Sequence, residues 1–372
     1  MSGGAAVDLD AARDLLRWIA ASPRPAGSEV EAAVRRRCAE LLVTWGFDEV
    51  REVPCVYSAL PGRWATPIGG ACSVAALLLA SWLGARRNGR GALLVLVGAL
   101  ALFSAAGSWL ARRGVLDAPL LRRRGLNLLA TRNGREPRVW LVAHLDSKSQ
   151  PVPTLVRAAG ITLSVVVWAA ALAVAALHVW GAPLAGAWLW IGGAGLVAGL
   201  PVVASTVGAN SAGAADDASG VAAVLLAARA VGAAIPLGVL LTTAEELGLA
   251  GARAWARSRS PGTAINVEAL DDVGALLCMT SGGEHGPVVE ALRRGAAAVG
   301  EPLAVRRTLP GLLTDGVALA DAGWRVATLC RGTLGTLARI HRPADDLAAL
   351  NGSGVALGAR VIAAAAEELG RG

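Results

Sequence analysis

The stretch VWLVAHLDS, residues 139–147, joins an apolar run to two polar side chains and indicates the fold. An unbroken apolar run such as 139–143 is typical of a strand that is buried on both faces of a sheet. His144 and Asp146 follow this run directly. Because open α/β sheets bind ligands beyond the carboxyl ends of their strands, we expect these two side chains to lie at a functional edge.

Similar apolar runs recur along the chain and alternate with helical patterns. Alternating strands and helices predict an α/β domain with a mixed, mostly parallel sheet and helices on both faces. We predict further strands at 50–57, 126–131, 237–243, 264–270, 276–280 and 326–330, and helices at 9–21, 29–45, 220–231, 287–299 and 353–369.

The composition is more apolar than that of an ordinary soluble domain. Hydrophobic residues make up 54% of the 372 residues and charged residues 17%, whereas a globular domain carries about 25% charged residues. Four runs contain no Asp, Glu, Lys or Arg, and each is close to the roughly 20 residues that cross a bilayer. We therefore predict transmembrane helices at 64–85, 91–111, 158–180 and 184–206 rather than four buried helices of a soluble core.

These runs pair into two transmembrane hairpins, at 64–111 and 158–206, which leave the α/β domain in three pieces, at 1–63, 112–157 and 207–372. A bias of basic residues marks the cytoplasmic side of a membrane protein. We therefore expect a multi-pass protein of the cell membrane with a cytoplasmic α/β domain. The bias rests on Arg63, Arg112, Arg113, Arg122, Arg123, Arg124 and Arg157, against Arg86, Arg87 and Arg90 on the far side.

The net charge of +7 comes almost entirely from arginine, because Lys148 is the single lysine. Nucleic-acid binding favours basic residues interleaved with aromatic ones, but aromatic residues are only 4% of this chain. The expected partner is therefore the lipid bilayer and not nucleic acid. Five scattered cysteines without a C-x-x-C pair favour buried free thiols. Residues 1–17 lack the features of a signal peptide, and no pattern specifies an oligomeric state.

Acidic residues gather where predicted strands and one loop end. Glu245 and Glu246 follow one strand, Glu268 lies near the end of another, and Asp216 lies in a Gly/Ala/Ser loop before a helix. Carboxylates at one edge of a sheet repel one another unless cations neutralise them. Imidazole nitrogen and carboxylate oxygen are ligand types that zinc accepts, so a two-metal site is the simplest resolution.

Six stretches resemble the motifs of the M28 family of zinc peptidases, which includes bacterial aminopeptidases, glutamate carboxypeptidase II and glutaminyl cyclase. The stretch at 139–147 resembles the family's strand that ends in His-x-Asp-Ser, and INVEAL at 265–270 resembles its Asn-x-Asp/Glu strand. The other matches are PRPAGSEVEAAVRRRCAELLVTWGF at 23–47, GAADDASGVAAVL at 213–225, LLTTAEELGLAGARAW at 240–255 and IHRPADDL at 340–347.

The resemblance implies a ligand set for two zinc ions per chain. His144 and Glu268 would hold one ion, Glu246 and His341 would hold the other, and Asp216 would bridge both. This division agrees with the alternation of side chains along an extended backbone, which lets adjacent glutamates point in different directions.

The resemblance also implies an activity, the hydrolysis of N-terminal peptide bonds by an aminopeptidase acting on a peptide substrate. Glu245 would act as the general base for a water whose pKa the metals lower. Asp146 would accept a hydrogen bond from His144 and fix the tautomer of that ring.

The sequence departs from the family pattern at two places. Glu268 stands where many members have Asp, and Asp271 or Asp272 could serve as the ligand instead. Gly316, after Asp315, replaces the usual His of a Ser/Thr-Asp-His segment.

Several other polar residues have simpler roles in our interpretation. His285 is expected in a loop, where it could touch substrate, and His178 is expected to pack between membrane helices. Asp345 and Asp346 are expected to cap a turn or to orient His341. Residues Arg122 to Arg124 are expected to form a membrane-surface anchor.

Three other functions are alternatives to the peptidase. A glutaminyl-cyclase-like enzyme would cyclise an amide and resembles a one-zinc version of the site. A non-catalytic membrane protein could keep the fold as a binding module, but it would have no need of Glu245. A transporter is disfavoured because the four apolar runs carry no acidic or basic residue at mid-membrane.

Overall fold

The computed structural model describes residues 7–308 and 311–371, and the chain divides into two compact units. Unit 1 consists of Met1–Ser58, Leu121–Ser149 and Ala209–Gly372, and unit 2 consists of Ala59–Leu120 and Gln150–Gly208. The described part does not include residues 1–6, which begin the stretch that lacks signal-peptide features. It also leaves out the side chains of Arg112 and Arg113.

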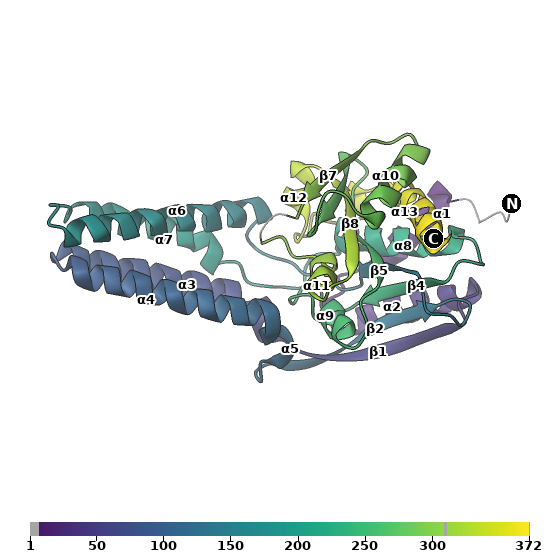
Figure 1. The fold of residues 1–372 in the computed structure, drawn as a ribbon, viewed down its shortest axis with the longest axis horizontal. Helices are drawn as coiled ribbons and strands as arrows, with labels where there is room; N and C mark the ends of the chain where they lie inside the picture. The colour runs from purple at the N-terminus through teal and green to yellow at the C-terminus, as the bar shows by residue number, and fades with distance from the viewer. Residues whose placement is uncertain (1–6, 309–310, 372) are drawn as a thin grey trace. The chain divides into compact units, whose positions relative to one another are not determined.

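One sheet forms the centre of unit 1, and within the described residues it has eight strands in the order β1-β2-β4-β3-β5-β8-β6-β7 (Figure 1). Strand β3 pairs in parallel with β4 and β5, β5 pairs in parallel with β8, and the β1–β2, β2–β4 and β6–β8 pairs are antiparallel. The predicted mixed α/β sheet is therefore confirmed. The strands are β1 (Glu49–Ser58), β2 (Arg122–Thr131), β3 (Val139–His144), β4 (Leu237–Thr242), β5 (Thr263–Leu270), β6 (Ala275–Thr280), β7 (Leu303–Arg307) and β8 (Arg325–Gly332).

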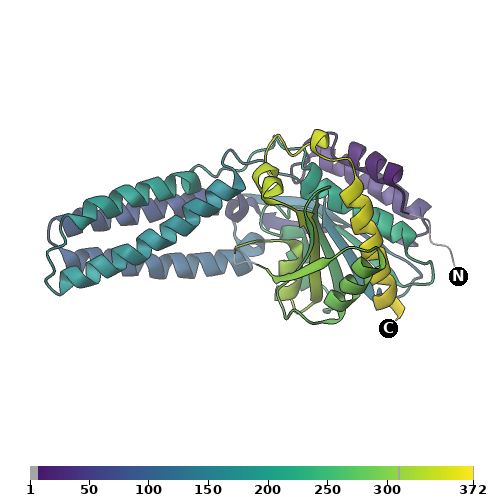
Figure 2. The ribbon, with the colours of Figure 1, turned by 90° about the horizontal axis from the view of Figure 1, so that it is seen from above.

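Helices cover both faces of this sheet (Figure 2). The side chains along β3 alternate between them. Val139, Leu141 and Ala143 belong to the buried cluster under α1, α8 and α13, whereas Trp140 and Val142 belong to the cluster under α9 and α11. The helices of unit 1 are α1 (Leu9–Ile19), α2 (Glu29–Thr44), α8 (Ser219–Ala230), α9 (Ala250–Arg257), α10 (Pro287–Ala298), α11 (Asp315–Asp321), α12 (Leu334–Arg339) and α13 (Ser353–Arg371), with short turns η2 (Ala214–Ala218) and η3 (Leu347–Ala349).

Residues Arg122 to Arg124, expected to anchor the chain at a membrane surface, form the exposed start of β2 and pair with residues 56–58 of β1. Their anchoring role stays a prediction. Strand β7 and helices α9, α11 and α12 were not predicted. β7 carries two exposed arginines, and the three helices have only six to eight residues, which is too short for a helical period to be visible.

Unit 2 is a bundle of long apolar helices (Figure 1). Their buried faces meet in one cluster that includes Leu77, Leu96, Trp168 and Trp188. Gly84 permits close packing, because a Cβ there would collide with the Trp188 indole. The helices are α3 (Ala59–Ala85), α4 (Gly89–Trp109), α6 (Thr154–Val179) and α7 (Ala187–Val203), with η1 (Leu110–Gly114) and α5 (Val115–Asp117) after α4.

Three helices of unit 2, α3, α4 and α6, are long and apolar enough to cross a membrane. The fourth predicted span forms the shorter helix α7, which has 17 residues where the sequence suggested 23. His178 packs between helices as expected, because its Nδ1 accepts a hydrogen bond from Trp188 Nε1 at 3.1 Å.

Candidate metal centre

The fold brings the predicted ligand residues to one edge of the sheet. His144 is the last residue of β3, and Glu245 and Glu246 follow the end of the neighbouring parallel strand β4. Glu268 lies near the end of β5, on the other side of β3. Because parallel strands end on the same side, these side chains share one rim with Asp216, which precedes α8.

The first cluster surrounds the His144 ring. Its Nε2 lies 3.4 Å from Glu268 Oε1, 3.1 Å from Asp216 Oδ1 and 4.0 Å from Glu245 Oε2. Nδ1 faces the backbone carbonyl of Asp146 at 2.9 Å. A carbonyl can only accept, so Nδ1 carries a proton and donates this hydrogen bond, while Nε2 faces the carboxylates.

The second cluster surrounds the His341 ring. Its Nε2 lies 2.8 Å from Asp216 Oδ2 and 3.4 Å from Glu246 Oε1. Asp216 therefore turns one carboxylate oxygen to each histidine. Atoms of His144, Glu245 and Glu268 lie within 4.8 Å of one another, and so do atoms of Asp216, Glu246 and His341.

These clusters fit divalent metal ions in donor type and spacing. Zinc binds imidazole and carboxylate at about 2.0–2.2 Å, so neighbouring ligand atoms stand roughly 3–3.5 Å apart. Asp216 lies 3.1 and 2.8 Å from the two histidines, and His341 lies 3.4 Å from Glu246, all close to this spacing. Glu246 Oε1 is buried and has no hydrogen-bond partner among the described residues, although it faces His341. A cation between these atoms would satisfy it.

The charges of the first cluster are strongly coupled. Burial lowers the pKa of His144, but the carboxylates of Glu245, Asp146, Asp216 and Glu268 raise it more, so it lies well above the ordinary value. Burial, reinforced by the neighbouring acids, raises the pKa of Glu245 well above its ordinary value despite His144. So much negative charge in a buried rim favours positive occupants.

Asp146 has a different contact from the one expected. The short bond to His144 comes from its backbone carbonyl, whereas its carboxylate lies 3.7 Å from Nδ1. That carboxylate instead accepts hydrogen bonds from the backbone N–H groups of Glu245 and Glu246, at 3.0 and 3.2 Å. Its side chain therefore fixes the loop that carries both glutamates. Ala244, which precedes them, has a left-handed φ of 54°, an uncommon backbone for a residue other than glycine.

Sequence reasoning missed two residues that hold the Asp216 loop. Asp345 accepts hydrogen bonds from the N–H groups of Ala215 and Asp216, at 2.8 and 3.2 Å, instead of orienting His341. Arg24 is buried and donates to the carbonyls of Leu145 at 2.8 Å and Gly213 at 3.1 Å. Both lie inside the quoted motif stretches, but their partners are more than 100 residues away, beyond what a local pattern can show.

Lys148 was noticed in the sequence only as the single lysine. Its Nζ lies 2.5 Å from Glu246 Oε2, at the second cluster. A lysine next to a candidate ligand is not part of the motif that identified that ligand, so the sequence carried no signal for the contact.

Other candidates lie outside the two clusters. Asp271 accepts hydrogen bonds from Thr336 and Arg339, and Asp272 accepts one from the N–H of Gly354 at 2.8 Å. His285 is 83% exposed, and Asp346 caps η3 as expected. Gly316 leaves no room for a side chain, because a Cβ there would collide with the Thr328 hydroxyl.

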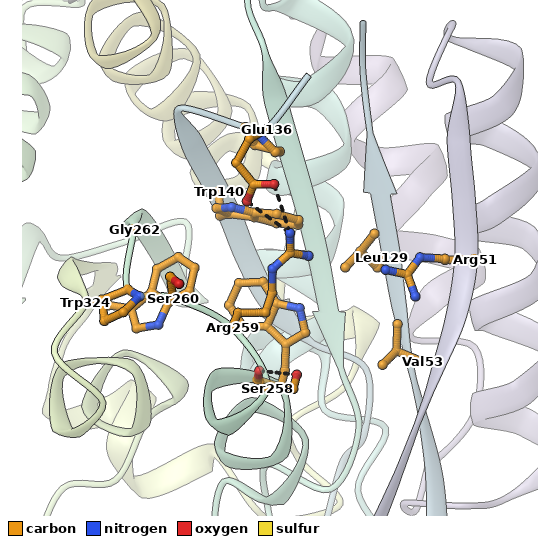
Figure 3. A pocket seen from close by; sticks show the side chains of 13 residues that line it. Arg51, Val53, Leu129, Glu136, Trp140, Ser258, Arg259, Ser260, Gly262 and Trp324 are labelled. Atoms are coloured by element: carbon orange, nitrogen blue, oxygen red, sulfur yellow. Dashed lines mark hydrogen bonds and ion pairs between the residues drawn. The ribbon is translucent and has the colours of Figure 1, made fainter. Parts of the chain in front are cut away.

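A cavity of about 580 Å³ lies at the opposite end of the parallel strands (Figure 3). It is lined by Trp140 at the start of β3, by Gly262 before β5 and by Trp324 before β8. The Arg259 guanidinium covers the Trp140 ring, with 5.0 Å between its carbon and the ring centroid, and pairs with Glu136 at 3.0 Å. This cavity is separate from the metal-binding candidates and holds none of them.

Comparison with known proteins points to one family. Residues 199–366 match Peptidase family M28. The matched region is a little under half of the chain. It contains Asp216, Glu245, Glu246, Glu268 and His341, whereas His144 and Asp146 precede it. No curated protein sequence matches the chain.

Solved structures show the same fold over nearly the whole chain. The aminopeptidase from Aneurinibacillus sp. strain AM-1 has a TM-score of 0.57 and 14% identity, covering 96% of this chain and 93% of its own. The zinc aminopeptidase from Bacillus subtilis has a TM-score of 0.56 and 14% identity, covering 96% and 94%. A glutaminyl cyclase from Bacteroides thetaiotaomicron bound to N-acetylhistamine has a TM-score of 0.58 and 13% identity, covering 97% and 98%.

Proposed function

We propose that this chain is a membrane-anchored, two-metal aminopeptidase of the M28 type. The M28 match and the zinc-aminopeptidase fold support a metallopeptidase. One observation carries the finer proposal: the two oxygens of Asp216 face His144 at 3.1 Å and His341 at 2.8 Å. A carboxylate between two histidine-containing clusters is suited to bridge two cations.

In this proposal each ligand has a stated place. His144 and Glu268 would hold one zinc ion, Glu246 and His341 would hold the other, and the two oxygens of Asp216 lie where they could serve both. When bound, the two ions supply Lewis acidity, which lowers the pKa of a water and favours negative charge on a peptide carbonyl oxygen.

Glu245 acts as the general base. Its Oε2 lies at the edge of the first cluster, 4.0 Å from His144 Nε2, and its backbone is fixed by Asp146. From that place its carboxylate takes the proton of the attacking water and delivers it to the leaving amine nitrogen. A pure binding module would have no use for this additional carboxylate beside a full ligand set.

The apolar bundle anchors the enzyme in a bilayer in this proposal. Its helices turn large apolar side chains outward, with Leu94 74% exposed, Val165 65% exposed and Leu189 80% exposed. Such surfaces are costly in water and stable against lipid. The cytoplasmic side remains our proposal for the α/β unit, from the arginine bias of the sequence.

A glutaminyl-cyclase-like activity is the second candidate, favoured by the structural likeness to the Bacteroides enzyme. The two candidates differ in metal content, because the cyclase resemblance implies one zinc ion and the aminopeptidase proposal needs two. They also differ in product, since a cyclase converts an N-terminal glutamine to a ring without releasing an amino acid.

The test uses the full chain, purified in detergent, with metal analysis, a panel of fluorogenic aminoacyl amides and a peptide with N-terminal glutamine. We expect about two metal ions per chain and release of the fluorophore. Glu245→Gln is expected to retain both ions and to lose about 10²–10⁴-fold in kcat, the contribution typical of a general base. Glu284→Gln, an exposed site, serves as the matched control. Undiminished turnover in Glu245→Gln contradicts the assignment of the base.

A further inference from the structure

Lys148 places a positive charge beside one of the two clusters. Its ammonium lies 2.5 Å from Glu246 Oε2, and both side chains are largely buried, at 16% and 4% exposed. The residue lies in the segment just after β3, four positions beyond His144. In a site whose other occupants are acids and imidazoles, this ammonium is a built-in cation.

The ammonium divides the two oxygens of Glu246 between different roles. Oε2 is held by Lys148, and Oε1 faces His341 Nε2 at 3.4 Å. As long as the ion pair is intact, Glu246 can offer one oxygen to a divalent cation, and its negative charge is already shared with a neighbour. Like charges repel, so a second cation next to the ammonium is less stable than it would be beside a free carboxylate.

The first cluster has neutral neighbours instead. Glu268 Oε1 faces His144 Nε2 at 3.4 Å, and its Oε2 accepts a hydrogen bond from the Asn266 amide at 3.4 Å. An amide leaves the full charge of the carboxylate available to a cation. The two clusters therefore share Asp216 but differ in the charge that surrounds their glutamate.

We propose that Lys148 makes the two metal positions unequal, acting through Glu246 as a positioning residue. The position formed by Asp216, Glu246 and His341 binds a divalent cation more weakly than the position formed with His144 and Glu268, and it exchanges first. Lys148 serves as the counter-ion of Glu246 when that ion has left. This inference rests on the proposed metal centre.

The test measures stepwise zinc binding to the full chain in detergent, with Zn²⁺ titrated against a chromophoric chelator. We expect two steps in the parent protein, with dissociation constants separated by more than about tenfold. Lys148→Met should tighten the weaker step by about tenfold or more, the range over which neighbours of metal ligands act, and leave the tighter step unchanged within about twofold. Lys148→Arg keeps the charge and should keep the separation.

Two further variants identify which position responds. Glu246→Gln should abolish the weaker step, and Lys148→Met should then have no added effect. If Lys148→Met does not fold, Lys148→Gln, a neutral donor, should tighten the weaker step by a smaller factor. The inference is overturned if the charge-removing variants leave the weaker step unchanged or shift both steps equally. A parent protein that binds no zinc refutes the proposed function itself, and one that binds two ions with equal affinity refutes this inference alone.

Discussion

Glu31 is a buried acid under the loop that carries Glu245, and its replacement gives a sharp test of the electrostatics of unit 1. One carboxylate oxygen accepts a hydrogen bond from the N–H of Gly27 at 2.6 Å, and the other accepts one from the Thr243 hydroxyl. Burial, assisted by the negative charge of Asp146, raises the pKa of Glu31 from 4.5 to about 7. The acid is therefore harder to ionise in the folded protein than in the unfolded chain.

The direction of the pH effect follows from that difference. Below pH 4.5 both states hold the proton, and the group contributes no pH dependence. Between pH 4.5 and about 7 the folded protein keeps the proton and the unfolded chain has released it, so the free energy of unfolding falls as pH rises. At about 1.4 kcal/mol per pKa unit, the rise from 4.5 to about 7 corresponds to a loss of up to about 3 kcal/mol.

Glu31→Gln removes the ionisation and keeps a side chain of the same shape. We expect the parent protein to lose about 2–3 kcal/mol more unfolding free energy than the variant between pH 5 and pH 8, because part of the total loss has already occurred at pH 5. The measurement is urea unfolding of metal-free protein in detergent, followed by tryptophan emission. Glu40→Gln, on the exposed side of the same helix, should behave like the parent. A parent-to-variant difference that is the same at both pH values would refute the reasoning.

Two other predictions concern the metal loop and the bundle. The Asp345 carboxylate accepts hydrogen bonds from the N–H groups of Ala215 and Asp216, so Asp345→Asn should lower zinc affinity in the chelator assay about tenfold. An unchanged affinity would mean that the loop holds its shape without this charge. The full chain should stay with membranes in alkaline carbonate, and recovery of the parent protein in the soluble fraction would exclude the membrane proposal. Val97 is 51% exposed near the middle of α4, so Val97→Arg should reduce insertion at a cost of about 2.5–3.5 kcal/mol.

Much of the sheet could be predicted because each strand is recognisable from its own local residues. The run at 139–143 is short and apolar at every position, a pattern typical of a strand covered on both faces. The order of strands and helices then placed His144, Glu245 and Glu268 at strand ends, and parallel pairing brought them to the same edge. These steps need only local sequence and general rules of α/β topology.

The supporting contacts of the site were beyond prediction because they join distant parts of the chain. Asp345 binds the Asp216 loop across 129 residues, and Lys148 reaches Glu246 from the segment that follows β3. The Asp146 side chain also makes long-range contacts that the sequence did not predict. The backbone carbonyl of Asp146 lies 2.9 Å from His144 Nδ1, and its carboxylate lies 3.7 Å from the same atom. The carboxylate also accepts a hydrogen bond from the N–H of Glu245, 99 residues further along the chain.

The path of the chain, more than the length of α7, determines whether this helix crosses the bilayer. His144 and Asp216 lie in the same unit and approach to 3.1 Å, although the chain between them runs through α6 and α7. If α6 crosses a bilayer, α7 must cross back, because the chain has to return to the side that holds His144. At 1.5 Å per residue its 17 residues span about 26 Å, less than the roughly 30 Å of a hydrocarbon core. A bilayer accommodates such a deficit by local thinning or through flanking residues, at a fraction of a kcal/mol per Å, so membrane anchoring through α6 includes α7 as its partner.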